Sequence, residues 1–212
     1  MTERLYCDNA YLTEFDGIVE KVSVRNGKQI AELNRSAFYP TSGGQPFDTG
    51  TLNGARVTDV FVNADGEVWH EIDGELSVGD RVHGKIDWAR RFDHMQQHGG
   101  EHMIAGAVYA LTGGMTIGLH LGAETSSIDV EFADGTTHAD DALIRRIEDY
   151  VNVRIQQDHP VRCWFPDADE LARLPLRKAP TVKEHVRIVA MGDFEMVACG
   201  GTHPSSTGQI GL

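Results

Sequence analysis

This sequence has no long apolar run, few cysteines and no excess of positive charge. No stretch approaches the roughly 18 consecutive apolar residues of a membrane helix, and the first residues lack the cationic, then apolar, pattern of a signal sequence. Only three cysteines occur in 212 residues, which are too few and too scattered for a disulfide framework. We therefore expect a cytoplasmic protein with reduced thiols and no membrane partner.

The shortage of positive charge limits the class of partner. The formal net charge is −13 at pH 7, with 19 Lys and Arg against 32 Asp and Glu. Broad binding of nucleic acid needs many cations to neutralise phosphates, so we expect no DNA partner, and any RNA contact is local. Basic residues gather between positions 171 and 187, where they include Arg177 and Lys178. This segment is either an RNA contact or a solvated surface of mixed charge.

Two pairs of metal-binding residue types share one spacing. His98 and His102 are four residues apart, so on a helix their β-carbons lie about 5–6 Å from each other on one face. Cys199 and His203 repeat this spacing. Because three imidazoles and one thiolate suit tetrahedral zinc, the sequence predicts one Zn²⁺ per chain held by these four residues. A small zinc finger is the weaker alternative, since roughly a hundred residues separate the two pairs.

The N-terminal part of the chain has the pattern of short strands joined by tight turns. Alternating runs between positions 17 and 86 are separated by Asn26-Gly27, Asn53-Gly54 and Asp65-Gly66. Such pairs are typical of two-residue hairpins, because both positions tolerate positive φ. The pattern predicts a small antiparallel β-barrel or sandwich.

From residue 88 onward the pattern changes to mixed helices and strands. Asp87 offers an N-cap to a helix over 88–111, which Gly113-Gly114 would end, and a second helix is expected to begin at Thr137 with Asp140. The other expected elements are strands over 116–121, 127–132, 186–191 and 194–198, and a short helix over 167–174. Together they predict an α+β domain with helices packed against an antiparallel sheet.

Two glycine pairs occupy positions of possible functional interest. Gly43-Gly44 permits positive φ and close approach of the backbone, so this loop either presents N–H groups to a phosphate, a ribose or a partner backbone, or is a plain connection. Gly99-Gly100 lies between the two histidines and costs the helix roughly 1 kcal/mol per residue relative to Ala. That cost suggests a bulky group against the backbone there, such as a substrate.

Three motifs together resemble one protein family. They are Tyr-Pro-Thr-Ser-Gly-Gly-Gln-Pro at 39–46, Met-Gln-Gln-His-Gly-Gly-Glu-His at 95–102 and Cys-Gly-Gly-Thr-His at 199–203. In this order, over nearly the whole chain, the sequence resembles the freestanding alanyl-tRNA editing proteins, the AlaX family related to the editing domain of alanyl-tRNA synthetase. The resemblance implies an N-terminal barrel over 1–87, a zinc-binding editing domain over 88–212, and hydrolysis of tRNA(Ala) wrongly charged with serine or glycine. It also implies the same four metal ligands.

The resemblance directs attention to residues that would contact the tRNA or its amino acid. Many family members have a hydroxyl residue, usually Thr, directly after the first histidine, where it can recognise the serine side chain. This chain has Gly99 there, so Thr202 or Ser42 would have to supply the hydroxyl. The predicted substrate contacts are Ser42, Gly43, Gly44, Gln45, Gly99, Thr202, Arg177 and Lys178.

The chemistry of the expected site leaves several interpretations open. Zinc with four protein ligands favours an organising role, whereas release of one ligand would let it polarise water. Glu101 is the candidate general base that would take a proton from that water. His98, Glu101 and His102 also fit the inverted H-x-x-E-H pattern of a zinc peptidase, but that pattern leaves Cys199 and His203 unexplained. A zinc-stabilised module that binds tRNA without hydrolysis is the non-enzymatic alternative.

Overall fold

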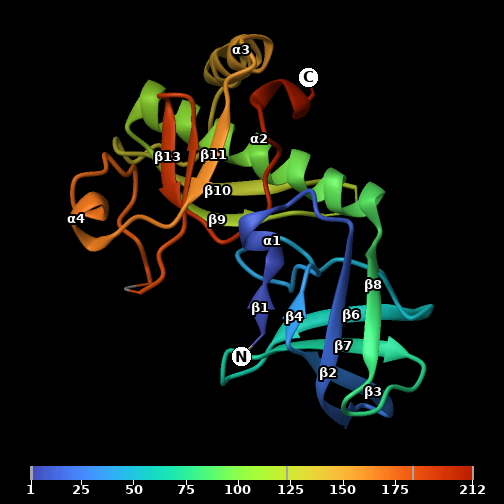
Figure 1. Ribbon diagram of the computed structural model, residues 1–212. Helices are drawn as coiled ribbons and strands as arrows, with labels where there is room; N and C mark the ends of the chain where they lie inside the picture. Colours follow the sequence, from blue (N-terminus) through green and yellow to red (C-terminus); the bar gives the residue numbers. More distant parts are fainter. Residues whose placement is uncertain (1, 123, 183, 212) are drawn as a thin grey trace. The chain divides into compact units, whose positions relative to one another are not determined.

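The computed structural model describes residues 2–122, 124–182 and 184–211 (Figure 1). The fold is α+β, as predicted, and the chain divides into two compact units, Met1–His94 and Met95–Leu212. The division falls inside helix α2 (Trp88–Thr112). The assignment of functional domains to 1–87 and 88–212 stays a prediction. Within the described ranges, none of the helices combines the length and apolar character needed to cross a membrane.

A closed six-stranded barrel forms most of the first unit. Its strands follow one another in the order β2-β3-β7-β6-β5-β8, and each neighbouring pair is antiparallel. Closure leaves no strand with a free edge. Of the two predicted architectures, a barrel or a sandwich, the barrel is therefore confirmed. The strands are β2 (Glu14–Arg25), β3 (Lys28–Leu33), β5 (Gly50–Leu52), β6 (Ala55–Val62), β7 (Val68–Asp73) and β8 (Arg81–Ile86). The unit also contains β1 (Glu3–Arg4), α1 (Leu5–Asp8) and β4 (Arg35–Ser36), with β1 and β4 paired in parallel.

Two of the three expected hairpin turns have the predicted backbone. Asn26 and Gly27 have φ of 53° and 80°, and Asn53 and Gly54 have φ of 49° and 86°, as a turn with two left-handed residues requires. The third turn is different, because only Gly66 has positive φ. There the side chain of Asn63 accepts from the backbone N–H groups of Asp65 and Glu67 and closes a longer turn.

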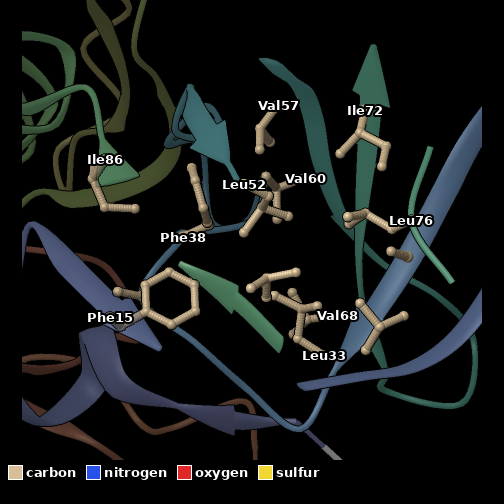
Figure 2. Packing of buried hydrophobic residues seen from close by; sticks show 14 residues of the cluster. Phe15, Leu33, Phe38, Leu52, Val57, Val60, Val68, Ile72, Leu76 and Ile86 are labelled. Carbon is tan, nitrogen blue, oxygen red and sulfur yellow. The ribbon is translucent and has the colours of Figure 1, made fainter. Parts of the chain in front are cut away.

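The interior of the barrel is a continuous cluster of apolar side chains (Figure 2). Alternate residues of β2 and β8 point inward, including Phe15, Val82 and Ile86, while their neighbours face solvent. Position 84 on β8 points inward, and only glycine fits there because a β-carbon would overlap the ring of Phe15. Period-two alternation in the sequence is therefore enough to place the core of this unit.

The second unit packs helices against antiparallel sheet, as predicted, but the sheet is divided in two. One sheet pairs β9 with β10, and the other has the order β11-β12-β13. The elements after α2 are β9 (Met115–His120), β10 (Ser127–Glu131), α3 (Asp141–Gln156), β11 (Val161–Trp164), α4 (Ala168–Leu171), β12 (Ile188–Met191), β13 (Glu195–Ala198) and the 3-10 helix η1 (Thr207–Gln209). The core joins Met103 of α2, Val151 of α3 and Val189 of β12. Strand β11 was not expected from the sequence.

Side-chain caps determine where the helices of this unit begin. Asp140 accepts from the backbone N–H of Leu143 at 2.8 Å, so α3 begins after it and the expected start at Thr137 is wrong. Asp167 caps α4 in the same way through the N–H of Glu170, but α4 ends at Leu171 instead of residue 174. Helix α2 ends before Gly113, whose φ is 68°, close to the predicted end.

Candidate metal centre

The structure brings the four predicted donors together within the second unit. His98 and His102 lie one turn apart on α2, Cys199 directly follows β13, and His203 comes four residues later. One donor atom from each residue lies within 4.8 Å of the other three. The Cys199 Sγ lies 3.5 Å from Nε2 of His98 and 3.4 Å from Nε2 of His203. This arrangement is the one that the paired spacing predicted, and it can hold a metal ion.

Burial and the kinds of donor atom show that the cluster fits a metal. The side chains of His98, His102 and His203 are all buried, with exposures of 2%, 8% and 3%. Nε2 of His98 and Nε2 of His203 both approach the Cys199 thiol. Three buried imidazoles around a thiol are unusual in an apolar core but are typical of metal ligands.

The electrostatics of the cluster favour a thiolate at Cys199. Burial alone would raise the pKa of Cys199, but the imidazoles of His98, His203 and His102 hold it well below its ordinary value. Burial lowers the pKa of His102, yet the neighbouring thiolate and Glu195 reverse this and raise it to about 9. Burial and the charge of His98 lower the pKa of His203 to about 3. The Cys199 thiolate and the neutral imidazole of His203 are the forms that bind a metal ion, whereas His102 would release its extra proton when the ion binds.

Arg187 fixes the turn that carries Cys199. Its guanidinium donates to the carbonyl oxygens of Cys199 at 3.1 Å and Gly201 at 2.8 Å, and its own carbonyl accepts from the Cys199 N–H at 2.9 Å. Arg187 is 6% exposed, so it is an internal support of the site and not part of a basic surface. No local pattern indicates this role, because in the sequence Arg187 is one cation of the basic run between positions 171 and 187.

Gly99 and Gly100 lie against the chain itself. A β-carbon at Gly99 would be 3.1 Å from Cδ1 of Ile210 and 3.3 Å from Cδ of Pro204, and one at Gly100 would be 3.6 Å from Ile210. Gln96 donates to the carbonyl oxygen of Gln209 at 2.7 Å, which holds the same segment against α2. The bulky neighbour expected from the sequence is therefore Ile210. The predicted contact of Gly99 with substrate stays a prediction.

Glu101 is buried beside the donors but is not among them. Its side chain is 5% exposed, and neither carboxylate oxygen has a hydrogen-bond partner in the described ranges. Burial raises the pKa of Glu101 to about 7, and the charge of His102 lowers it in part. The cluster of four donors does not include it. Its predicted role as a base stays a prediction.

The basic segment does not form one basic surface. Arg177 makes a two-pronged ion pair with Glu195, so its guanidinium is not presented to a phosphate, which argues against the predicted tRNA contact. Lys178 is exposed, and Lys183, part of the same basic run, lies outside the described residues. Thr202 is fully buried next to His203.

The Gly-rich loop belongs to the first unit and has a well-defined base. Ser42 and Gln45 exchange backbone hydrogen bonds of 3.1 and 2.9 Å across Gly43 and Gly44, whose φ values are 56° and 85°. Both glycines are exposed, and a β-carbon at Gly43 would meet no atom within 4 Å. Only the backbone conformation therefore requires glycine at position 43.

The base of this loop is held by a buried ion pair that sequence reasoning missed. Asp48 accepts from the backbone N–H of Tyr39 at 2.6 Å and from Nε of Arg91 at 3.0 Å. Arg91 also donates to the carbonyl oxygens of Ala10 at 2.8 Å and Ala37 at 2.6 Å. Neither charged side chain has any solvent exposure. These residues lie far apart in the sequence, and no local pattern relates them.

Comparison with known proteins finds matches at both ends of the chain. The family model for class II (A) tRNA synthetases matches residues 7–90, and the model for the second additional domain of threonyl- and alanyl-tRNA synthetases matches residues 186–212. The second match contains Cys199 and His203.

Similar proteins cover almost the whole sequence. The alanyl-tRNA editing protein AlaX-M of Methanosarcina acetivorans is 39% identical over 99% of this chain and 90% of its own length. AlaX-L of Pyrococcus horikoshii is 37% identical over the full chain and 53% of its own length. The alanine–tRNA ligase of Pyrococcus furiosus is 35% identical over 99% of this chain but only 23% of the ligase. With this identity over nearly the full length of AlaX-M, the chain belongs to the family of alanyl-tRNA editing proteins.

Proposed function

We propose that this protein is a trans-editing hydrolase that removes serine or glycine from wrongly charged tRNA(Ala). The observation that carries the proposal is the buried cluster of His98, His102, Cys199 and His203, in a chain whose relatives are named for alanyl-tRNA editing. The two pairs of donors lie in the segments that carry two of the three motifs of the family resemblance. The predicted partner is the acceptor end of tRNA(Ala).

The metal proposed for the cluster is one Zn²⁺ per chain. Three imidazole nitrogens and one thiolate form a set that zinc accepts in tetrahedral geometry, and the lowered pKa of Cys199 favours the required thiolate. When bound, zinc supplies positive charge that organises the site and can polarise an oxygen atom. His98, His102, Cys199 and His203 would each contribute one ligand atom.

The residues of the chain would share the remaining work of hydrolysis. An aminoacyl ester is already activated, so the site mainly has to place a water molecule, stabilise oxyanion charge and hold the tRNA end. Glu101 would accept a proton from that water, because its carboxylate is buried with no hydrogen-bond partner in the described part of the chain. Thr202 and Gly99 are the predicted neighbours of the amino acid. Ser42, Gly43, Gly44, Gln45 and Lys178 are the predicted contacts to the tRNA.

Deacylation assays test the proposed activity. The full chain is incubated with Ser-, Gly- and Ala-tRNA(Ala), and loss of the esterified label is followed over time. We expect faster loss of serine or glycine than of alanine, and no cleavage in a peptide panel. Binding of tRNA with an intact ester would show a binding module instead, and peptide cleavage would favour the peptidase.

Metal analysis tests the proposed zinc. Protein purified without a histidine tag should contain about one zinc per chain, as four ligands in one cluster imply. The double variant Cys199→Ala, His203→Ala should lose it. Cys163→Ala is the matched control, because Cys163 is an exposed cysteine outside the cluster. Zinc retained by the double variant at the wild-type level would disprove the four-ligand site.

A further inference from the structure

Next to His102 lies a buried carboxylate. Oε1 of Glu195 is 3.8 Å from Nδ1 of His102, and Glu195 is 3% exposed. The distance is longer than a hydrogen bond, and within the described residues Nδ1 has no hydrogen-bond partner. A small movement of either side chain would bring Nδ1 and Oε1 within hydrogen-bond distance.

Glu195 is held in place by a second charged residue. Nε of Arg177 donates to both carboxylate oxygens, at 3.1 and 2.9 Å, and a terminal nitrogen of Arg177 donates to Oε1 at 2.9 Å. The other terminal nitrogen donates to Oγ1 of Thr116 at 3.2 Å. The side chains of Arg177 and Glu195 are 7% and 1% exposed. A forked ion pair of this kind fixes both the position and the plane of the carboxylate.

Helix α2 is shaped to admit this carboxylate. Gly106 lies one turn after His102, and a β-carbon there would be 3.0 Å from Oε2 and 3.4 Å from Cβ of Glu195. A glycine in the interior of a helix is unfavourable, so the close approach of Glu195 gives this position a reason. Glu195 is also the first residue of β13, the strand that leads directly to Cys199.

We propose that Glu195 is the positioning residue of the metal site and that Arg177 holds it in that role. The Glu195 carboxylate would accept the Nδ1–H of His102, which leaves the lone pair of Nε2 free for the ion. Glu195 is not among the four clustered donors, so its carboxylate would support a ligand without becoming one. This inference rests on the proposed metal site and deepens it, because it states which nitrogen of His102 faces the ion.

The test measures metal affinity directly, without tRNA. Full-length Glu195→Gln and wild-type protein compete for Zn²⁺ with a chromophoric chelator. Loss of an outer carboxylate that orients a histidine ligand typically weakens metal binding about 10- to 100-fold, and we expect a loss in this range. Glu32→Gln is the matched control, because Glu32 is 1% exposed, pairs with Lys21 at 2.9 Å and belongs to the first unit. Its zinc affinity should equal that of the wild type.

A second measurement separates positioning from general loss of structure. In ¹⁵N NMR spectra of the zinc-bound protein, the His102 imidazole should carry its proton on Nδ1. Arg177→Gln should weaken zinc binding in the same direction as Glu195→Gln, and Arg177→Lys should restore part of the affinity. If Glu195→Gln fails to fold, these two Arg177 variants supply the affinity comparison.

The possible failures of the two proposals differ. Wild-type zinc affinity in a folded Glu195→Gln or Arg177→Gln variant would overturn the positioning role, as would a proton on Nε2 of His102. A wild-type protein that binds no Zn²⁺ would overturn it together with the zinc site. A protein that binds zinc and loses it in Glu195→Gln, but does not deacylate tRNA, would refute the proposed function alone.

Discussion

Ile210 packs directly over Gly99, with its Cδ1 only 3.1 Å from the point where a β-carbon of residue 99 would lie. Position 99 directly follows a metal ligand, so any side chain introduced there must displace Ile210 or Pro204. This contact decides how the specificity of the site can be tested.

Gly99→Thr is expected to be destabilising by itself and informative in combination. Overpacking of a filled site typically costs about 1–3 kcal/mol, and Ile210→Ala should recover most of that loss by making room. Alanine is smaller than serine, so rejection of alanine must come from a polar group that the serine hydroxyl satisfies. We expect Gly99→Thr with Ile210→Ala to raise the ratio of kcat/KM for Ser-tRNA(Ala) over Ala-tRNA(Ala). An unchanged ratio in the folded, zinc-loaded double variant would show that position 99 does not face the amino acid.

Asp48→Ala should strongly destabilise the first unit. Removal of this carboxylate leaves the buried Arg91 guanidinium without its counter-ion, which typically costs about 3–5 kcal/mol of unfolding free energy. Asp59→Ala is the control, because Asp59 pairs with Arg25 at 3.0 Å while both side chains are partly exposed, and such pairs contribute about 1 kcal/mol or less. Urea unfolding measures the loss of unfolding free energy in both variants. Equal losses for the two variants would contradict the importance of burial here.

Substitution of either loop glycine should impair editing more than metal content. Val cannot readily adopt the positive φ of Gly43 or Gly44, so the exchange of hydrogen bonds between Ser42 and Gln45 would be disturbed. We expect Gly43→Val and Gly44→Val to deacylate mischarged tRNA(Ala) more slowly with zinc unchanged. Gly66→Val is the control for strain alone, since Gly66 has φ of 81° in another exposed turn of the same unit. Normal deacylation by both loop variants would make the loop a simple connection.

His70 should make the stability of the first unit depend on pH. Burial lowers the pKa of His70 to about 4, while the backbone carbonyl of Ala31 raises it slightly. In the unfolded chain the pKa is near 6.5, so below that pH the unfolded state binds a proton that the folded state excludes. The contribution of His70 to the unfolding free energy is therefore complete above about pH 6.5. It falls as the pH approaches 4, by on the order of 2 kcal/mol at pH 5.

The variant His70→Gln isolates this contribution. Its side chain can replace the bonds to Ser36 and Ala31 without taking up a proton. The difference in unfolding free energy between wild type and variant should shrink, or change sign in favour of the variant, as the pH falls from 8 to 5. A difference independent of pH would mean that the pKa of His70 is the same in the folded and the unfolded protein.

Local patterns in the sequence predicted the parts of this protein that depend on local physics. The spacing of His98 and His102 follows from helix geometry, and the alternation in β2 follows from strand geometry, so both were recognised without tertiary information. Asp48 and Arg91, by contrast, are paired only because the fold brings the loop before β5 to the first turn of α2. Arg177 looked like a surface cation until the fold placed it against Glu195. Burial of a charge is a property of the fold, and one sequence carries no local sign of it.

The four donors of the metal cluster come from two segments far apart in the sequence. Helix α2 supplies two of them, and the other two lie on a turn that follows β13, which pairs with β12, and that Arg187 holds through the carbonyl oxygen of Cys199. An ion bound by both segments closes a loop of roughly a hundred residues, so we expect its contacts to form late in folding. Contacts that form after the transition state slow unfolding far more than they speed folding. The ion would therefore act on the lifetime of the folded second unit, with little effect on how fast that unit folds.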